Sequence, residues 1–264
     1  MTLDYLLGLT LGLIFGSFFN VIIHRLPLHI EGVINKNKSQ NSLLKNLSWP
    51  ASSCTNCHKK LNWFDNIPVI SWLLLKGQCR FCNTSIKPRY LIVEIITAIA
   101  FMHCFSHYGF EAEAWLWLAF FSIAIILFFI DAETFYLPDL LTIPFLLLGI
   151  LASFLGVTNI EIYNSFIGAA LGFTILYVIN FTYKAVRKVD GLGAGDFKLL
   201  AALGAWFGWG SLLPIIGLSS GLALFFILLM HLFTQSSFKL NSMIPLGPFL
   251  ILSGFILYVQ TYLF

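Results

Sequence analysis

Three aspartates stand beside apolar stretches, where a carboxylate is costly and is therefore a functional candidate. Asp131 ends an apolar run, Asp139 follows Pro138, and Asp196 closes a Gly-Ala-Gly-Asp sequence. Two carboxyl groups that face one space hold a single proton between them, because like charges a few Å apart cannot both ionise easily. The ionised member takes a proton from water while the protonated member polarises a peptide carbonyl. An acid pair here is thus suited to aspartyl proteolysis.

Each of these acids also has a structural interpretation. Asp139 and Asp196 stand where helices are expected to begin, and an Asp there caps the first backbone N–H groups. Asp131 stands at the end of a helix, where the macrodipole disfavours an anion, so a structural role explains it least well. We predict that Asp131 and Asp196 form the catalytic pair and that Asp139 is mainly a helix cap.

Two Cys-x-x-Cys pairs form a second chemical cluster, Cys54 with Cys57 and Cys79 with Cys82. Such pairs in a polar segment are typical of a tetrahedral thiolate zinc site. The 21 residues between the pairs slightly exceed the usual spacing of about 15–20. A redox role and unliganded thiols are the alternatives. The fifth cysteine, Cys104, lies in an apolar stretch and is predicted to be a packing residue.

The elements that carry these residues are predicted to be membrane helices. Of the 264 residues, 58% are hydrophobic and 10% are charged, with a mean hydropathy of +0.86. A soluble domain of this size cannot bury so much apolar surface. Full spans need about 17–25 residues, so the sixth apolar stretch is too short to cross comfortably. The eight apolar stretches are 3–23, 90–106, 114–131, 139–156, 162–183, 197–208, 211–233 and 246–264.

The charges are segregated along this pattern. If the N-terminus lies outside, all 15 Lys and Arg residues fall on one side, whereas the opposite loops at 107–113 and 157–161 hold only acids. The positive-inside rule makes the basic side cytoplasmic. This places the four paired cysteines in a reducing compartment, where persistent disulfides are rare. It also explains the net charge of +3 without a nucleic-acid partner, and we expect none.

The predicted fold is an all-α polytopic membrane protein with about eight transmembrane helices and a small cytoplasmic zinc-binding insert. Residues 31–48 are polar and predict a mobile loop, and no internal repeat is evident. Three acids in polar loops are expected to be solvated, namely Glu31, Asp65 and Asp190. The predicted domains are a first transmembrane helix over 1–23, a cytoplasmic cysteine-rich zinc domain over 24–89 and a transmembrane aspartyl peptidase domain over 90–264.

Several motifs together resemble the bacterial type IV prepilin peptidase, or leader peptidase, family. A Gly-x-Gly-Asp sequence alone would be weak, but the combination is specific and spans most of the chain. The matching segments are 16–27 (GSFFNVIIHRLP), 66–75 (NIPVISWLLL), 88–90 (PRY) with Glu94, 130–131 (ID) followed by 137–139 (LPD) and Thr142, and 193–198 (GAGDFK).

The resemblance implies a bifunctional enzyme of the bacterial inner membrane. Members of this family of intramembrane aspartyl peptidases cut the leader from type IV prepilins or type II secretion pseudopilins at the cytoplasmic face. They then N-methylate the exposed residue, usually Phe, using S-adenosylmethionine. The resemblance implies that Asp131 and Asp196 are the catalytic acids. It assigns the zinc ligands to Cys54, Cys57, Cys79 and Cys82.

The methyl-donor site cannot be located from sequence. No glycine-rich dinucleotide fingerprint follows a predicted strand, so the region 16–27 and the cysteine-rich domain are the places to search. Asn20, within the first span, is expected to hydrogen-bond either another helix or a substrate. Two alternative functions stay open: a peptidase without methyltransferase activity, and a non-catalytic membrane scaffold that carries zinc.

Overall fold

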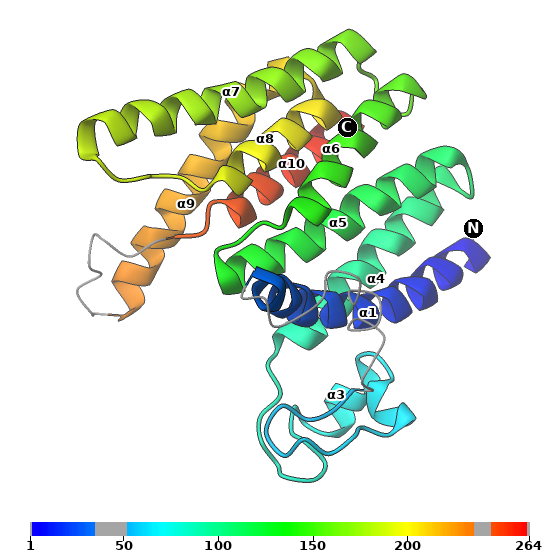
Figure 1. The fold of residues 1–264 in the computed structure, drawn as a ribbon. Helices are drawn as coiled ribbons and strands as arrows, with labels where there is room; N and C mark the ends of the chain where they lie inside the picture. Colours follow the sequence, from blue (N-terminus) through cyan, green and yellow to red (C-terminus); the bar gives the residue numbers. More distant parts are fainter. Residues whose placement is uncertain (1, 35–51, 235–243, 263–264) are drawn as a thin grey trace. The chain divides into compact units, whose positions relative to one another are not determined.

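The computed structural model describes residues 2–34, 52–234 and 244–262, and its regular structure is helical apart from two isolated β-bridges (Figure 1). The all-α class is confirmed, and a helix forms at each predicted apolar stretch. These helices are α1 (Thr2–Ile34), α4 (Arg89–Tyr108), α5 (Ala112–Thr134), α6 (Asp139–Phe154), α7 (Ile162–Arg187), α8 (Ala194–Phe207), α9 (Leu212–Thr234) and α10 (Gly247–Tyr262).

Length and composition mark the chain as a multi-pass membrane protein. In the described part, five helical segments are long and apolar enough to cross a bilayer, and α6 and α10 are shorter apolar helices. The predicted count of eight spans stays a prediction. The five long segments are Leu3–Val33, Arg89–Tyr108, Ala112–Thr134, Ile162–Arg187 and Trp209–Phe233. The chain divides into two compact units, Met1–Ile126 and Leu127–Phe264.

Helix α1 is longer than its apolar stretch, which was expected to end at residue 23. It continues to Ile34 because the buried face continues: Ile23, Leu26 and His29 are buried at helical spacing. Of the loop predicted over 31–48, residues 31–34 belong to this helix, and the remainder lies outside the described residues.

A stripe of glycines brings α1 against α4 within the first unit. A Cβ built on Gly8, Gly12 or Gly16 would lie 2.5–2.8 Å from a backbone Cα atom of α4. Small residues at a spacing of four let two membrane helices approach closely, and this contact sets the positions of the polar groups that the two helices carry. The spacing of these glycines is visible in the sequence, but the helix that they contact is not.

The cysteine insert, residues 52–88, contains two backbone turns of the same geometry. The sequence does not reveal this repeat. In each Cys-x-x-Cys pair the first cysteine, Cys54 or Cys79, donates its N–H to the carbonyl five residues later, at 3.0 and 2.9 Å. The backbone carbonyls of the same two cysteines accept the N–H groups of His58 and Asn83, which both have φ of 56°. The two turns therefore share one backbone geometry, although their other residues differ.

Asp65, which was expected to be solvated, is buried between the two cysteine pairs. It lies in a short 3-10 helix, η2 (Trp63–Asn66), and its Oδ1 accepts hydrogen bonds from Arg80 Nε at 2.9 Å and from the second guanidinium nitrogen at 2.8 Å. The Arg80 guanidinium also lies over the ring of Phe64. The prediction of a solvated Asp65 was wrong because its partner, Arg80, lies 15 residues further along the chain. Nothing in the sequence around Asp65 indicates this contact.

Helix α8 forms the core of the second unit, where it packs against α6 and α7 (Figure 1). Its sequence is apolar on every side, which is typical of a buried helix. The Trp206 indole donates to the Phe145 carbonyl at 2.9 Å, and the Ser165 hydroxyl donates to the Ala205 carbonyl at 2.7 Å. These bonds fix the short helix, and with it the acid at its N-terminus.

Candidate active site and cysteine cluster

Asp131 lies near the end of α5 and is held by the first residue of α10. Its side chain is buried, and its Oδ2 accepts the N–H of Gly247 at 3.0 Å. A Cβ built on Gly247 would lie 2.6 Å from that same oxygen. Only glycine therefore lets the backbone approach the carboxylate so closely.

We expect Gly247→Ala to lower the rate of any reaction that uses Asp131 by about 10²-fold, because a displacement near 1 Å of a reacting group has effects of this size. Gly217→Ala is the matched control, since nothing lies within 4 Å of a Cβ at that position in α9. Turnover of both variants in the same membranes would test this, and equal rates would contradict the proposed fit around Asp131.

Asp196 is the third residue of α8 and caps that helix. Its half-buried carboxylate accepts the N–H of Gly193 through Oδ2 at 3.2 Å, so the capping interpretation is confirmed. This bond occupies one oxygen. Within the described ranges, the Oδ1 atoms of both Asp131 and Asp196 have no hydrogen-bond donor. Capping and chemistry are therefore compatible, because each acid keeps one oxygen available.

The glycines beside the two acids, Gly195 before Asp196 and Gly247 bound to Asp131, both lie against one buried side chain, Leu137. A Cβ on Gly195 would meet Leu137 Cβ at 2.7 Å, and a Cβ on Gly247 would meet Leu137 Cδ1 at 3.3 Å. The charges of Asp131 and Asp196 also interact electrostatically. The structure thus brings together the two residues that the sequence paired, as two carboxylates from helices far apart in the chain.

Asp139 has a different role from the predicted cap. Pro138 occupies the cap position and Asp139 is the first helical residue of α6, so its side chain makes no cap hydrogen bond. Its exposed carboxylate instead forms an ion pair with Lys198 of α8. The Asp139–Lys198 pair ties the beginnings of α6 and α8 together near the two acids.

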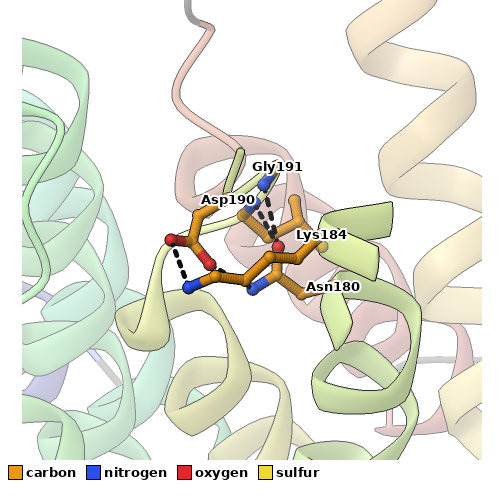
Figure 2. Close-up of polar contacts among 5 residues, drawn as sticks. Asn180, Lys184, Asp190 and Gly191 are labelled. Carbon is orange, nitrogen blue, oxygen red and sulfur yellow. Dashed lines mark hydrogen bonds and ion pairs between the residues drawn. The ribbon is translucent and has the colours of Figure 1, made fainter. Parts of the chain in front are cut away.

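Asn180 of α7 anchors the glycine-rich loop that leads into α8 (Figure 2). Its Oδ1 accepts the N–H groups of Gly191 at 2.8 Å and Leu192 at 3.0 Å, and its Nδ2 donates to Asp190 at 3.3 Å. Asp190 also accepts a hydrogen bond from Lys184 at 2.9 Å, and this contact holds the pKa of Asp190 below its ordinary value. Asp190 was expected to be solvated, and it is exposed but paired.

We expect Asn180→Ala to lower the activity that depends on Asp196 by about 10- to 100-fold, because the loop before that acid loses two backbone anchors. Asp190→Asn is the control: it keeps a side chain of the same shape and removes only an exposed ion pair, which contributes little. Rates measured for the two variants should therefore differ, and an equally small loss in both would show that the loop needs no anchor.

The four predicted zinc ligands converge in the first unit. The sulfurs of Cys54, Cys57, Cys79 and Cys82 all lie within 4.8 Å of one another, and no disulfide joins the described cysteines. A tetrahedral site with Zn–S bonds near 2.3 Å places its sulfurs about 3.8 Å apart. The Cys54 and Cys82 sulfurs are 3.7 Å apart, so the cluster fits a zinc ion.

The electrostatics of this cluster favour a cation. The hydroxyl and backbone of Thr84 lower the pKa of Cys82 to about 6. A backbone hydrogen bond from Lys59 favours the thiolate of Cys57, but burial and the neighbouring thiols raise its pKa to about 11. Four thiols so close together cannot all ionise without a positive charge among them, and a divalent metal supplies it.

Sequence reasoning missed Asn180 and Gly247, the two residues that position the acids. Pro248 marks the start of a helix, but nothing local shows that Gly247 contacts a residue 116 positions earlier. A separate surface hollow, lined by 159–161, 164 and 207–210, lies at the opposite end of α8. Glu161 is the one titratable residue of that lining, so the hollow offers no acid pair.

Comparison with known proteins identifies the family of this chain. Residues 10–108 match the family model described as bacterial peptidase A24 N-terminal domain, and residues 118–233 match the type IV leader peptidase family. The chain is 37% identical to a protein of Dichelobacter nodosus, over 98% of this chain and 95% of that one. It is 36% identical to one of Pseudomonas aeruginosa, over 93% and 87%. Both relatives are named prepilin leader peptidase/N-methyltransferase. No solved structure matches the chain.

Proposed function

The chain belongs to the type IV leader peptidase family, and we propose that it removes the leader peptide from type IV prepilins and then N-methylates the new N-terminal residue. The observation that carries the proposal is the pair Asp131 and Asp196, each with one oxygen bound to a backbone N–H and one oxygen that accepts no hydrogen bond from the described residues. The shared name of the relatives supports both halves of the activity. S-adenosylmethionine is the proposed methyl donor, and type II pseudopilins are further proposed substrates.

The proposed cleavage step needs only water and the two acids. The ionised carboxylate takes a proton from water, whose oxygen bonds to the carbonyl carbon of the scissile peptide. The protonated partner donates a hydrogen bond to the carbonyl oxygen as charge develops there. When the C–N bond breaks, the leaving amine takes a proton from the pair. Asp131 and Asp196 serve in this scheme as general base and general acid.

The cysteine cluster is proposed to hold a structural zinc ion. Four protein thiolates fill every position of a tetrahedral site and leave none for water, which is typical of structural rather than catalytic zinc. When bound, the metal supplies the charge that permits these thiolates to lie together. A small insert tethered at both ends has little core of its own, so the metal would stabilise its fold.

The proposed topology follows from the charges. We place the N-terminus in the periplasm and the cysteine insert in the cytoplasm, with the protein in the inner membrane. The functional division proposed is a first transmembrane helix over 1–23, a zinc domain over 24–89, of which 24–34 continue α1, and a peptidase domain over 90–264. Both acids then act at the cytoplasmic face, where water and the first apolar residues of a membrane-embedded substrate are within reach.

Mass spectrometry of a prepilin co-expressed with the protein tests this function. We expect the mature N-terminus, without its leader, with a mass increase equal to one added methylene unit. A cleaved but unmethylated product would support a peptidase without methyltransferase activity. A substrate that keeps its leader, under conditions where the protein is present in the membrane, would reject the peptidase assignment.

A further inference from the structure

A buried carboxylate lies in the unit that carries the cysteine insert. Glu94, on the second turn of α4, is 8% exposed. Its Oε2 accepts the N–H of Val69 at 2.7 Å, and the Ser17 side chain also hydrogen-bonds to it. Over the described part of the chain, no Lys, Arg or His pairs with Glu94. Burial of a carboxylate against neutral donors alone is costly, so this charge is suited to a cationic ligand.

Asn20 of α1, close to Glu94 in the α1–α4 contact, carries a buried hydrogen-bond acceptor. Asn20 is 3% exposed, and its Nδ2 donates to the carbonyls of Tyr90 at 3.0 Å and Gly16 at 3.3 Å. The contact with Tyr90 confirms that Asn20 bonds another helix. Its Oδ1 is buried and accepts no hydrogen bond from the residues described. A buried amide oxygen without a donor is uncommon in folded proteins, so this atom has capacity for a ligand.

The two groups are neighbours on the α1–α4 contact. Tyr90 precedes Glu94 by one helical turn, and Gly16 precedes Asn20 by one turn. A Cβ on Gly16 would lie 2.8 Å from the Glu94 Cα, so the helices touch at both levels. One turn is about 5.4 Å. The two acceptors are therefore carried at neighbouring levels of one helix contact, and among the described residues neither accepts a hydrogen bond from a positively charged group.

The cysteine insert contacts Glu94 through Val69, a residue with a strained backbone conformation. Val69 has φ of 61°, a conformation that a β-branched residue rarely adopts, and its N–H is the group bound to Glu94. Such outliers persist only where the surrounding structure holds them, and they cluster at functional sites. Val69 immediately precedes the short helix α3 (Ile70–Leu74), so the insert is fixed against α4 at the acid.

We propose that Glu94 and Asn20 bind a primary ammonium group that takes part in methyl transfer. An ammonium supplies three N–H donors and a positive charge, which match two acceptors of which one is anionic. A sulfonium has the charge but no donor, so it fits less well. The inference rests on the proposed methyltransferase activity and locates one of its binding sites. Two reactants carry such a group: the new N-terminal residue of the substrate and the methionine part of S-adenosylmethionine.

With the substrate ammonium bound, Glu94 has a chemical use as well. The carboxylate takes one proton from the ammonium and leaves a neutral amine. The amine nitrogen attacks the methyl carbon of the donor, the N–C bond forms, and the C–S bond breaks with its electron pair on sulfur. The product is a secondary ammonium and a neutral thioether, and Glu94 then releases its proton to water. With the donor ammonium bound, Glu94 orients that reactant only.

Glu94→Gln tests the inference because it removes the charge but keeps an oxygen for the Val69 N–H. Methylation is assayed on an already mature peptide with a free N-terminus, and leader cleavage is assayed separately on the precursor. We expect methylation to fall by about 10- to 100-fold, the value of one hydrogen bond to a charged group. Leader cleavage should stay near wild type. Glu113→Gln, at an exposed acid in the first turn of α5, is the control.

The KM values separate the two sources of the ammonium. A raised KM for the peptide, with an unchanged KM for S-adenosylmethionine, assigns the site to the methyl acceptor, and the reverse assigns it to the donor. Unchanged methylation in Glu94→Gln would overturn the inference. Equal losses of cleavage and methylation would also overturn it, because a structural fault lowers both. A wild-type protein that cleaves but never methylates would reject the methyltransferase proposal itself, and this inference with it.

Discussion

Asp131→Asn and Asp196→Asn should each lower the rate of leader cleavage by about 10²–10⁴-fold, the usual contribution of a general acid or base. Asn has nearly the shape of Asp and keeps an oxygen for the N–H of Gly247 or Gly193, so the helices should stay in place. What each substitution removes is the ability to take and give a proton. The rates are to be measured on purified protein in lipid nanodiscs with a synthetic prepilin.

Asp139→Asn is the matched control for these variants. Asp139 lies close in sequence to Asp131 and its ion pair with Lys198 ties α6 to α8, but its carboxylate is exposed. We expect this variant to cleave within about twofold of wild type, since exposed ion pairs contribute little. Wild-type rates in either Asp131→Asn or Asp196→Asn would remove that residue from the mechanism.

Loss of the metal should unfold the cysteine insert. Metal affinity in small zinc domains is largely folding free energy, about 10–16 kcal/mol. Cys79→Ser removes a buried ligand, so we expect it to lose bound zinc and to expose residues 52–88 to proteases. Chelation of wild-type protein should have the same effect. Elemental analysis and limited proteolysis are the measurements.

Cys104→Ser is the control for the zinc experiment. Cys104 is buried in α4, as the packing prediction required, and it does not belong to the four-sulfur cluster. This variant should keep one zinc per chain and the wild-type proteolysis pattern. A wild-type protein without stoichiometric metal, or an insert whose protease resistance survives chelation, would show that the four thiols do not hold a structural ion.

Local patterns predicted a large share of this molecule. Apolar runs predicted a helix at each stretch, because the tendency of a segment to be buried in lipid or protein depends on the composition of that segment alone. Cysteine spacing predicted the four-sulfur cluster, since two Cys-x-x-Cys pairs in one small segment are typical of a single tetrahedral metal site. The expected position of Asp131 and Asp196 at one membrane face predicted an acid pair; their charges interact in the structure, and their catalytic roles stay a prediction.

The remaining features depend on contacts between distant segments. Gly247 holds Asp131, Asn180 holds the loop before Asp196, and Arg80 buries Asp65. In each case one partner is an ordinary residue whose role appears only when the helices or turns are placed side by side. The repeated turns of the insert were also hidden, because hydrogen bonds and positive φ values are shared while the side chains differ.

The central claim is that Asp131 and Asp196 work as one unit on the scissile peptide. The most direct test is the cleavage rate of the double variant Asp131→Asn/Asp196→Asn, measured beside the two single variants in the same nanodiscs. Residues that act as a unit have strongly non-additive effects. We predict that the double variant is no slower than either single variant, with all three at least about 10²-fold below wild type. Single losses that multiply in the double variant would contradict a shared acid pair.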